Sequence, residues 1–455
     1  MLISAGSPRL LDGHIGELLD FLDSSPGTPP AARRRRPGRP GRRRVRRGRS
    51  PAAGAAPYRL RLPRPGQSAP RHDARPPPAV RAALDTLGAP AREHTGLSPS
   101  QVLYGKRAST PPGDAQLRQR PAGTDVCQPL LGSVQIAATR LLAACGVSPD
   151  LTLGHSTGEF AAAAAASALT GEDTVRLLAH RGAALAQAET GARGGMLAVQ
   201  SDKETCRRLV HRIDDVWFAC FNHPRQVVVS GTVQGLAALR RACAAAKVAA
   251  VTLEVSNAFH SPRLASAEAA MRADLARRPV TRPPVAFVSC VSAALCSDPA
   301  ELRELRARHA CAPVRFEEAV RSAYTHGARV FLQVTGNRSL LASVRRSLAG
   351  HDDIRLAGTD GPAPDSGRGF LQALAHLAVL GAPVDPRALI PHQDRRLLDL
   401  PVARLDTQSY WIQQPRRPAM AGRERSLVRP ALGPGGRTRN GCGRPPVREA
   451  DRGHL

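Results

Sequence analysis

Leu151-Thr-Leu-Gly-His-Ser-Thr-Gly-Glu-Phe160 joins a short apolar run to an Ala-rich segment that continues to Leu169. This pattern predicts a strand, a sharp turn and a helix, with Ser156 at the turn. Gly154 and Gly158 flank the serine at the G-x-S-x-G spacing of a nucleophile elbow. Such a turn needs small neighbours, and it exposes the hydroxyl near backbone N–H groups that can bind an oxyanion. A Gly-rich turn whose serine caps the helix is the alternative.

The formal charge of +28 on 455 residues is concentrated in two stretches. Residues 33–49 hold eleven arginines and no acid, and residues 413–455 hold ten arginines against three acids, so together they carry +18. Both stretches mix Arg with Pro and Gly and lack aromatic residues, which predicts disordered basic segments. We therefore expect no specific nucleic-acid binding, although nonspecific attraction to polyanions stays open.

The cysteine pattern and the hydropathy indicate a cytoplasmic protein. Nine cysteines occur without a C-x-x-C pair, which favours reduced thiols and predicts no metal centre. The longest nearly apolar run, Phe160 to Leu169, is too short to span a bilayer, and the N-terminus does not resemble a signal peptide. We expect no membrane association.

The chain divides by composition into an ordered middle and two irregular ends. Residues 1–24 predict a short amphipathic helix, and residues 25–80 an Arg/Pro-rich disordered block. A folded domain is expected over 81–400, followed by a short segment at 401–412 and a disordered basic tail at 413–455.

Periodicity within the folded part predicts an α/β fold with an inserted subdomain. Residues 196–256 follow the order strand, helix, strand, strand, helix, strand, which is the ferredoxin-like unit. The other expected helices lie near 80–87, 125–146, 160–169, 171–186, 264–277, 313–327, 339–348 and 366–380, and the other strands at 151–153, 285–291 and 330–334.

Arg181 is unusual because it lies on the apolar side of its predicted helix, among Leu177, Leu178 and Leu185. A desolvated guanidinium needs an anionic partner, and no acid stands one turn away. Its partner is either a distant carboxylate or a bound ligand. The alternative is a position at the edge of the face, from which the side chain reaches water.

His260 lies in the segment Ser256-Asn-Ala-Phe-His-Ser-Pro262, directly after the last strand of the inserted unit. A histidine in a loop at this place is a candidate general base. A solvated loop histidine is the alternative.

Six segments, in order, resemble the motifs of malonyl-CoA:acyl-carrier-protein acyltransferases, and in particular the acyltransferase domain of modular type I polyketide synthases. The resemblance covers roughly residues 81–412. The segments are Gln128-Pro-Leu130, Gly154-His-Ser-Thr-Gly-Glu159, His180-Arg-Gly182, Asn222-His-Pro-Arg-Gln-Val-Val-Val-Ser-Gly231, Asn257-Ala-Phe-His-Ser-Pro262 and Phe331-Leu-Gln-Val-Thr-Gly336.

The resemblance implies an α/β-hydrolase-like large subdomain with a parallel sheet, and it implies roles for individual residues. Ser156 would be the nucleophile and His260 the general base, while Arg181 would bind the substrate carboxylate. The N–H groups of Thr157 and Gln67 would form the oxyanion hole. The remaining implied site residues are Asn257 and Phe259, which would set specificity for malonyl groups, and Gln128, His155 and Asn222, which would complete the pocket.

The resemblance also implies the substrates and partners. Acyl-CoA would be the donor, and the phosphopantetheine thiol of an acyl carrier protein the acceptor, with other polyketide synthase domains as neighbours and no bound cofactor. Residues 1–24 and 401–412 resemble remnants of the linkers that flank the domain.

One family feature is replaced in this chain. The family begins with an apolar strand that ends in F-P-G-Q-G-x-Q, whereas this chain has Arg61-Leu-Pro-Arg-Pro-Gly-Gln67. Pro65-Gly-Gln67 is either a remnant or a coincidence. The compositions of 25–80 and 413–455 suggest shifted reading frames. A serine thioesterase or hydrolase, and a catalytically impaired fragment with polyanion-binding ends, are the alternative functions.

Overall fold

The computed structural model describes residues 78–96, 99, 123–188, 194–336, 338–360 and 367–390. The predictions for residues 1–24, 401–412 and 413–455 lie outside these ranges, and so does Gln67. The block 25–80 overlaps them only at 78–80, which form the first turn of a helix. Its end was therefore placed three residues too late.

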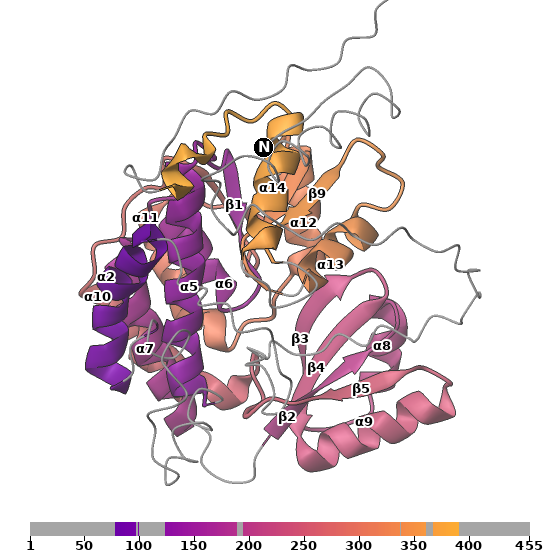
Figure 1. Cartoon of the computed structure of the whole chain (residues 1–455). Coiled ribbons are helices and arrows are strands. Elements are labelled where there is room, and N and C mark those ends of the chain that lie inside the picture. Colours follow the sequence, from indigo (N-terminus) through magenta and orange to yellow (C-terminus); the bar gives the residue numbers. More distant parts are fainter. Residues whose placement is uncertain are drawn as a thin grey trace, which may run out of the picture.

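Four helices pack together on one side of the molecule (Figure 1). They are α2 (Pro78–Thr95), α5 (Thr124–Ala144), α7 (Gly171–Ala188) and α10 (Ala265–Ala276). Gly182 allows α7 to approach α5 closely, because a Cβ there would lie 2.7 Å from the carbonyl oxygen of Thr124. This close approach sets the place of the neighbouring residue, Arg181.

Two small sheets stand beside these helices. In the first, β1 (Leu151–Leu153) pairs in parallel with β6 (Ala286–Ser289), and β6 pairs antiparallel with β7 (Ala294–Leu295). In the second, β8 (Val330–Gln333) pairs in parallel with β9 (Arg355–Gly358). The parallel pairing was predicted, but β7 and β9 were not. Two residues are too few to show a period, and β9 carries only one bulky apolar side chain, Leu356.

The inserted unit has the predicted order of elements. It comprises β2 (Gly194–Val199), α8 (Lys203–Val210), β3 (Val216–His223), β4 (Gln226–Thr232), α9 (Val233–Ala245) and β5 (Ala250–Leu253). Its four strands form one antiparallel sheet in the order β3-β4-β2-β5. Leu197, Val229 and Leu239 are buried in its own core, so the unit is packed independently of the helical layer.

The remaining helices connect and cover the strands. They are α6 (Gly158–Ala165), η2 (Pro262–Leu264), α11 (Pro299–Ala307), η3 (Arg308–Ala310), α12 (Phe316–Thr325), α13 (Ser339–Ser347), α14 (Arg368–Val379) and η4 (Pro386–Leu389). Helix α11 was not predicted. Its start signal is clear in retrospect, because Asp298 precedes Pro299 and accepts a hydrogen bond from the N–H of Glu301 at 2.9 Å.

The described ranges contain no candidate membrane span, no candidate metal cluster and no disulfide. None of their helices combines the length and the apolar character that a bilayer crossing requires. None of their His, Cys, Asp and Glu side chains gather into a group that could hold a metal ion. The cysteines that the structure describes are free thiols.

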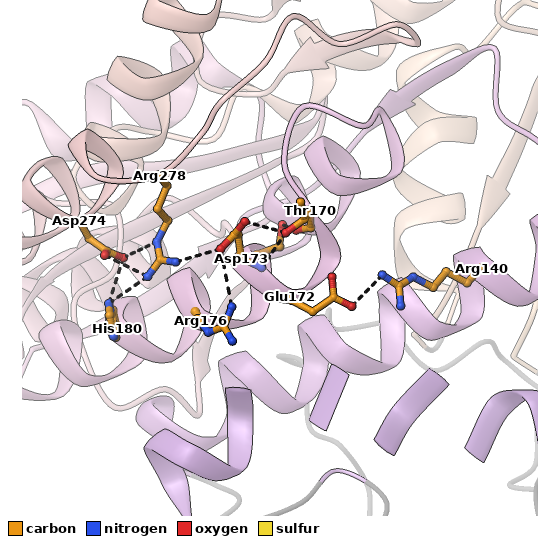
Figure 2. A network of polar contacts seen from close by, with 9 residues as sticks. Arg140, Thr170, Glu172, Asp173, Arg176, His180, Asp274 and Arg278 are labelled. Atoms are coloured by element: carbon orange, nitrogen blue, oxygen red, sulfur yellow. Dashed lines mark hydrogen bonds and ion pairs between the residues drawn. The ribbon is translucent and has the colours of Figure 1, made fainter. Parts of the chain in front are cut away.

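A chain of polar contacts ties α5, α7 and α10 together (Figure 2). Arg140 pairs with Glu172 at 3.1 Å, and Arg278 contacts both Asp173 and Asp274. Asp274 is the most buried member, at 5% exposure, and its carboxylate accepts hydrogen bonds from two guanidinium nitrogens of Arg278, each at 3.0 Å. Bidentate geometry of this kind is the strong form of an ion pair.

Replacing Asp274 with Ala should lower the free energy of unfolding by about 1–3 kcal/mol, because the partly buried guanidinium of Arg278 loses its bidentate partner and keeps only the longer contact with Asp173. Urea unfolding followed by circular dichroism measures the change. The matched control is Arg321→Ala, which breaks an exposed helix pair with Glu317 and should cost no more than about 1 kcal/mol. Equal effects of the two substitutions would contradict the prediction.

Candidate active site

A cavity of about 1300 Å³ opens between the two sheets of the large part and the inserted unit. Ser156 and His260 line it, together with Gln128 and Arg181 from the helical layer. The structure thus brings together four residues that the sequence predicted as a site, although they are spread over more than a hundred positions.

The turn that carries Ser156 has the strained geometry of a nucleophile elbow. Ser156 has φ +50°, which is unusual for a residue with a side chain. Gly154 is required, because a Cβ there would lie 2.3 Å from the backbone N of Glu159. Gly158 is not required in the same way, since its added Cβ would lie 3.7 Å from Gln135. Thr157, not Ser156, stands at the N-cap of α6, so the alternative of a capping serine is wrong.

Ser156 Oγ lies 2.8 Å from His260 Nε2. On the other side of the ring, Nδ1 lies 3.1 Å from the carbonyl oxygen of His309 and 3.0 Å from that of Ala312. Two carbonyls can only accept, so Nδ1 carries the proton and Nε2 is free to accept one from the serine hydroxyl. His260 is 3% exposed, so the alternative of a solvated loop histidine is wrong.

Burial lowers the pKa of His260 well below its usual value, and neighbouring His309 and Arg181 lower it further. The ring is therefore neutral at pH 7, which is the form that takes a proton from a nucleophile. Within the described ranges, the groups that orient it are backbone carbonyls rather than a carboxylate.

The N–H of Thr157 is suited to bind an oxyanion. It lies next to Ser156 at the N-terminus of α6, and it makes no hydrogen bond to any residue that the structure describes. The partial positive charge of a helix N-terminus favours an anion there. Gln67, the other predicted donor, lies outside the described residues.

Arg181 is 2% exposed, so the alternative of a side chain that reaches water is wrong. Its Nη1 donates to Gln128 Oε1 at 2.5 Å, and its Nη2 lies 3.2 Å from His309 Nδ1. Among the described residues no carboxylate pairs with it, so a distant internal acid is excluded there. Burial is the main cause that lowers the pKa of Arg181 to about 10, and the positive charge of Arg306 is the second. The guanidinium therefore stays charged at pH 7.

A buried charge cluster lies behind the elbow, and the sequence reasoning missed it. Glu159 Oε1 lies 2.8 Å from Arg306 Nη1 and accepts a hydrogen bond from Ser289 Oγ at 2.5 Å. Glu159 Oε2 lies 3.3 Å from His309 Nε2. Burial alone would raise the pKa of Glu159, but the charge of Arg306 and contacts with His309 and Ser289 lower it to about 2.

The charges of this cluster do not cancel. Burial lowers the pKa of His309 to about 4, so its ring is neutral at pH 7. Two guanidiniums, Arg181 and Arg306, then share one carboxylate, Glu159. Because Arg181 lines the cavity, an anionic group bound there would neutralise the excess charge.

His155 joins the elbow to the inserted unit. Its Nε2 lies 2.8 Å from Asn222 Oδ1, and Asn222 Nδ2 donates to Gln226 Oε1 at 2.8 Å. Burial lowers the pKa of His155, so it is neutral at pH 7. The two predicted pocket residues, His155 and Asn222, are therefore direct partners.

The two predicted specificity residues have different surroundings. Phe259 lines the cavity directly before His260. Asn257 is 4% exposed, is absent from the cavity wall, and donates to the carbonyl oxygen of Leu185 at 3.0 Å. Asn257 thus holds the loop against α7 rather than facing the cavity.

A weak signal in the sequence marks one of the missed residues, Arg306, as unusual, although it does not identify its partner. Leu302, Leu305 and Arg306 follow helical spacing, which places a charged side chain on the apolar face of α11. This is the same anomaly that singled out Arg181.

Comparison with known proteins agrees with the motifs. The family model described as "Acyl transferase domain" matches residues 75–383. Polyketide synthase GfsA of Streptomyces halstedii is 31% identical over 347 residues, which cover 75% of this chain and 4% of that protein. The malonyl CoA-acyl carrier protein transacylase of Bacillus subtilis is 30% identical over 225 residues, or 48% of this chain and 71% of that protein.

A solved structure gives the same result. The acyltransferase domain from the second module of the salinomycin polyketide synthase superimposes with a TM-score of 0.60 at 27% identity, covering 70% of this chain and 71% of that one. The chain therefore spans a small part of the polyketide synthase it matches, and most of a single solved domain.

The rate at which phenylmethylsulfonyl fluoride labels Ser156 should stay constant as the pH falls through 6.5, and decline only below that value. The reason is that His260 must be neutral to accept the proton, and its pKa is lowered. Arg181→Ala removes one cation that lowers this pKa, so the midpoint of the decline should move to higher pH. Labelling followed by mass spectrometry across pH measures both curves.

Arg308→Ala is the control for this experiment, because it removes an exposed guanidinium from the same segment. Its midpoint should match that of the wild type. An unchanged midpoint for Arg181→Ala would contradict the electrostatic account.

Proposed function

Because the chain belongs to the acyl transferase domain family, we propose that it transfers a malonyl-type acyl group from CoA to the phosphopantetheine thiol of an acyl carrier protein. The supporting observation is the hydrogen bond between Ser156 and His260 in a cavity that also contains the buried, carboxylate-free Arg181. A nucleophile and an anion-binding group in one cavity fit a thioester substrate that carries a free carboxylate.

The first half-reaction forms an acyl-serine ester. Ser156 Oγ attacks the thioester carbon while His260 Nε2 takes its proton. The N–H of Thr157 stabilises the negative oxygen of the tetrahedral intermediate. The intermediate then expels the CoA thiolate, which receives the proton from His260.

The second half-reaction reverses these roles with a different thiol. The carrier thiol gives its proton to His260 and attacks the ester carbon, and the proton then passes to Ser156 Oγ as the ester bond breaks. The exchange is of the ping-pong type and needs no bound cofactor.

Arg181 selects for the carboxylate of the extender unit. A malonyl carboxylate can form two parallel hydrogen bonds with a guanidinium, and it would neutralise the excess buried charge. An acetyl group would leave that charge unpaired, which disfavours it. Phe259 lies on the cavity wall, where its ring limits the space beside the acyl group and favours malonyl over branched units.

The proposal also includes the fold class of the domain, its neighbouring domains and its cellular location. The elbow after β1 and the unit inserted between α7 and α10 support an α/β-hydrolase-like core with a ferredoxin-like insertion. The relatives' names support other polyketide synthase domains as neighbours, and a cytoplasmic location follows from that setting.

Hydrolysis is the second candidate. A cavity of about 1300 Å³ is larger than the roughly 300–1,000 Å³ of common ligand pockets, so water has room beside Ser156. Incubation with malonyl-CoA and a loaded carrier protein separates the two reactions: transfer gives malonyl-carrier protein, and hydrolysis gives free malonate.

Exposure to malonyl-CoA should add one malonyl group to the intact protein, located at Ser156 by peptide mass spectrometry. Ser156→Ala should abolish the adduct, and His260→Ala should slow its formation by about 10²–10⁴-fold. Ser148→Ala, which changes an exposed serine at the rim of the cavity, should leave it intact. An unlabelled wild-type protein that is folded by circular dichroism would refute the assigned nucleophile.

Replacing Arg181 with Ala should reduce the preference for malonyl-CoA over acetyl-CoA by about 10–100-fold, the equivalent of losing one hydrogen bond between charged groups. Competition between the two thioesters for Ser156 measures the ratio. Arg308→Ala should preserve it, and an unchanged ratio in Arg181→Ala would remove Arg181 from the carboxylate role.

A further inference from the structure

His309 lies behind the cavity, where Arg181, His260 and the buried carboxylate of Glu159 come together. It is the middle residue of the short helix η3 and is 0% exposed. Its side chain is absent from the cavity wall. His309 therefore does not touch a substrate bound in the cavity, and any effect of its ring on the reaction must pass through the residues that it contacts.

The contacts of the imidazole ring assign its two nitrogens. Arg181 Nη2 lies 3.2 Å from Nδ1, and a guanidinium can only donate, so Nδ1 is the acceptor. The ring is neutral at pH 7, because burial lowers its pKa to about 4, and its one proton is then on Nε2. That nitrogen lies 3.3 Å from Glu159 Oε2. The ring thus turns its acceptor toward a cation and its donor toward an anion.

Packing holds the ring in this orientation. The ring of Phe160 lies edge-to-face against it, with centroids 5.2 Å apart, and the ring of His260 does the same at 5.5 Å. Turning the imidazole over would exchange both nitrogens for carbon atoms, so the contacts with Arg181 and Glu159 would be lost together. One orientation of the ring therefore satisfies both of its charged neighbours.

The guanidinium of Arg181 depends on this ring for its own orientation. Its Nη1 donates to Gln128 Oε1 at 2.5 Å, and its Cζ lies 5.4 Å from the centroid of the Phe160 ring. One hydrogen bond leaves a planar group free to pivot about Nη1, whereas a second one at Nη2 fixes the plane. The plane matters because a guanidinium binds a carboxylate through two parallel hydrogen bonds. A small error in its placement is therefore costly.

The backbone of His309 has a different task from its ring. Its carbonyl oxygen lies 3.1 Å from His260 Nδ1. The next residue, Ala310, accepts a hydrogen bond from the backbone N–H of His260 at 2.9 Å. A substitution at position 309 removes the ring and keeps the carbonyl, so mutation can separate the two contributions.

We propose that the ring of His309 is a positioning residue for substrate selection. It holds the guanidinium of Arg181 in the plane in which a carboxylate is bound, while Glu159 holds the ring from behind. The proposal deepens the carboxylate role of Arg181 and rests on the proposed function. Loss of the acceptor at Nδ1 should therefore lower the preference for malonyl-CoA over acetyl-CoA, and not only the rate.

Three substitutions of His309 separate its two nitrogens. Asn places its side-chain oxygen near the position of Nδ1, where it can accept from Arg181. Gln places its amide near the position of Nε2, on the side of Glu159, and Leu has a similar size and no polar atom. The measurement is the ratio of the rate constants with which malonyl-CoA and acetyl-CoA acylate Ser156 in the full chain. Both thioesters use the same nucleophile and base, so damage to either lowers both rates and leaves the ratio unchanged.

His309→Asn should keep this ratio within about threefold of the wild type, whereas His309→Gln and His309→Leu should lower it about tenfold, the equivalent of one hydrogen bond to a charged group. Arg308→Ala changes the exposed neighbour and should leave the ratio unchanged. Equal ratios in the Asn and Gln variants would overturn the proposal. This comparison of two neutral amides stands even if His309→Leu does not fold.

The tautomer of His309 is a measurement that does not depend on activity. NMR of the ring nitrogens in protein made with isotope-labelled histidine distinguishes a protonated nitrogen from an unprotonated one, and the signals of His309 are those absent from His309→Asn. We expect the proton on Nε2. A proton on Nδ1 would overturn the proposal, because that nitrogen could not accept from Arg181.

Failure of the proposed function gives a different result. A wild-type protein with the proton of His309 on Nε2, in which Ser156 takes neither acyl group, would refute the proposed function and with it the role in selection. The contact between the ring and Arg181 would remain established.

Discussion

The buried ion pair of Glu159 and Arg306 holds the site together. Glu159 is the third residue after Ser156, and its carboxylate also accepts a hydrogen bond from Ser289 on β6 and approaches His309 on η3. His309 in turn uses its carbonyl to orient His260 and its ring to contact Arg181. Removing one partner of such a pair leaves an uncompensated buried charge, so the positions of Ser156, His260 and Arg181 depend on one interaction.

The same cluster explains why a fully buried arginine is stable without an internal acid. Gln128 and His309 contact its Nη1 and Nη2, its buried Nε has no partner among the described residues, and Glu159 supplies part of the opposing charge from behind. Coulomb energy at close range in a poorly solvated interior is large, so the remaining positive charge attracts an anion strongly. The charge distribution around Arg181 is therefore suited to an anionic ligand.

Local patterns predicted the parts of the site that depend on local constraints. The elbow around Ser156 and the loop of His260 are contiguous motifs, and helical spacing placed Arg181 on the apolar side of its helix while leaving open whether it is buried or reaches water. The roles of Arg306 and His309 could not be predicted, because their partner Glu159 lies about 150 positions earlier. The sequence also did not predict how the strands divide between two sheets. Strand pairing depends on contacts between distant residues, and the pairing of β1 with β6 joins residues 135 positions apart.

The left-handed backbone of the elbow restricts which nucleophiles this scaffold can use. Ser156 and His260 have φ +50° and +60°, a region that unbranched side chains tolerate with some strain and β-branched ones avoid. Threonine, although chemically a hydroxyl nucleophile, would clash with its own backbone at position 156. Cysteine has no second branch at Cβ and fits. The backbone at position 156 therefore tolerates substitution of the serine by cysteine but not by threonine. The restriction comes from conformation and not from the reactivity of the side chain.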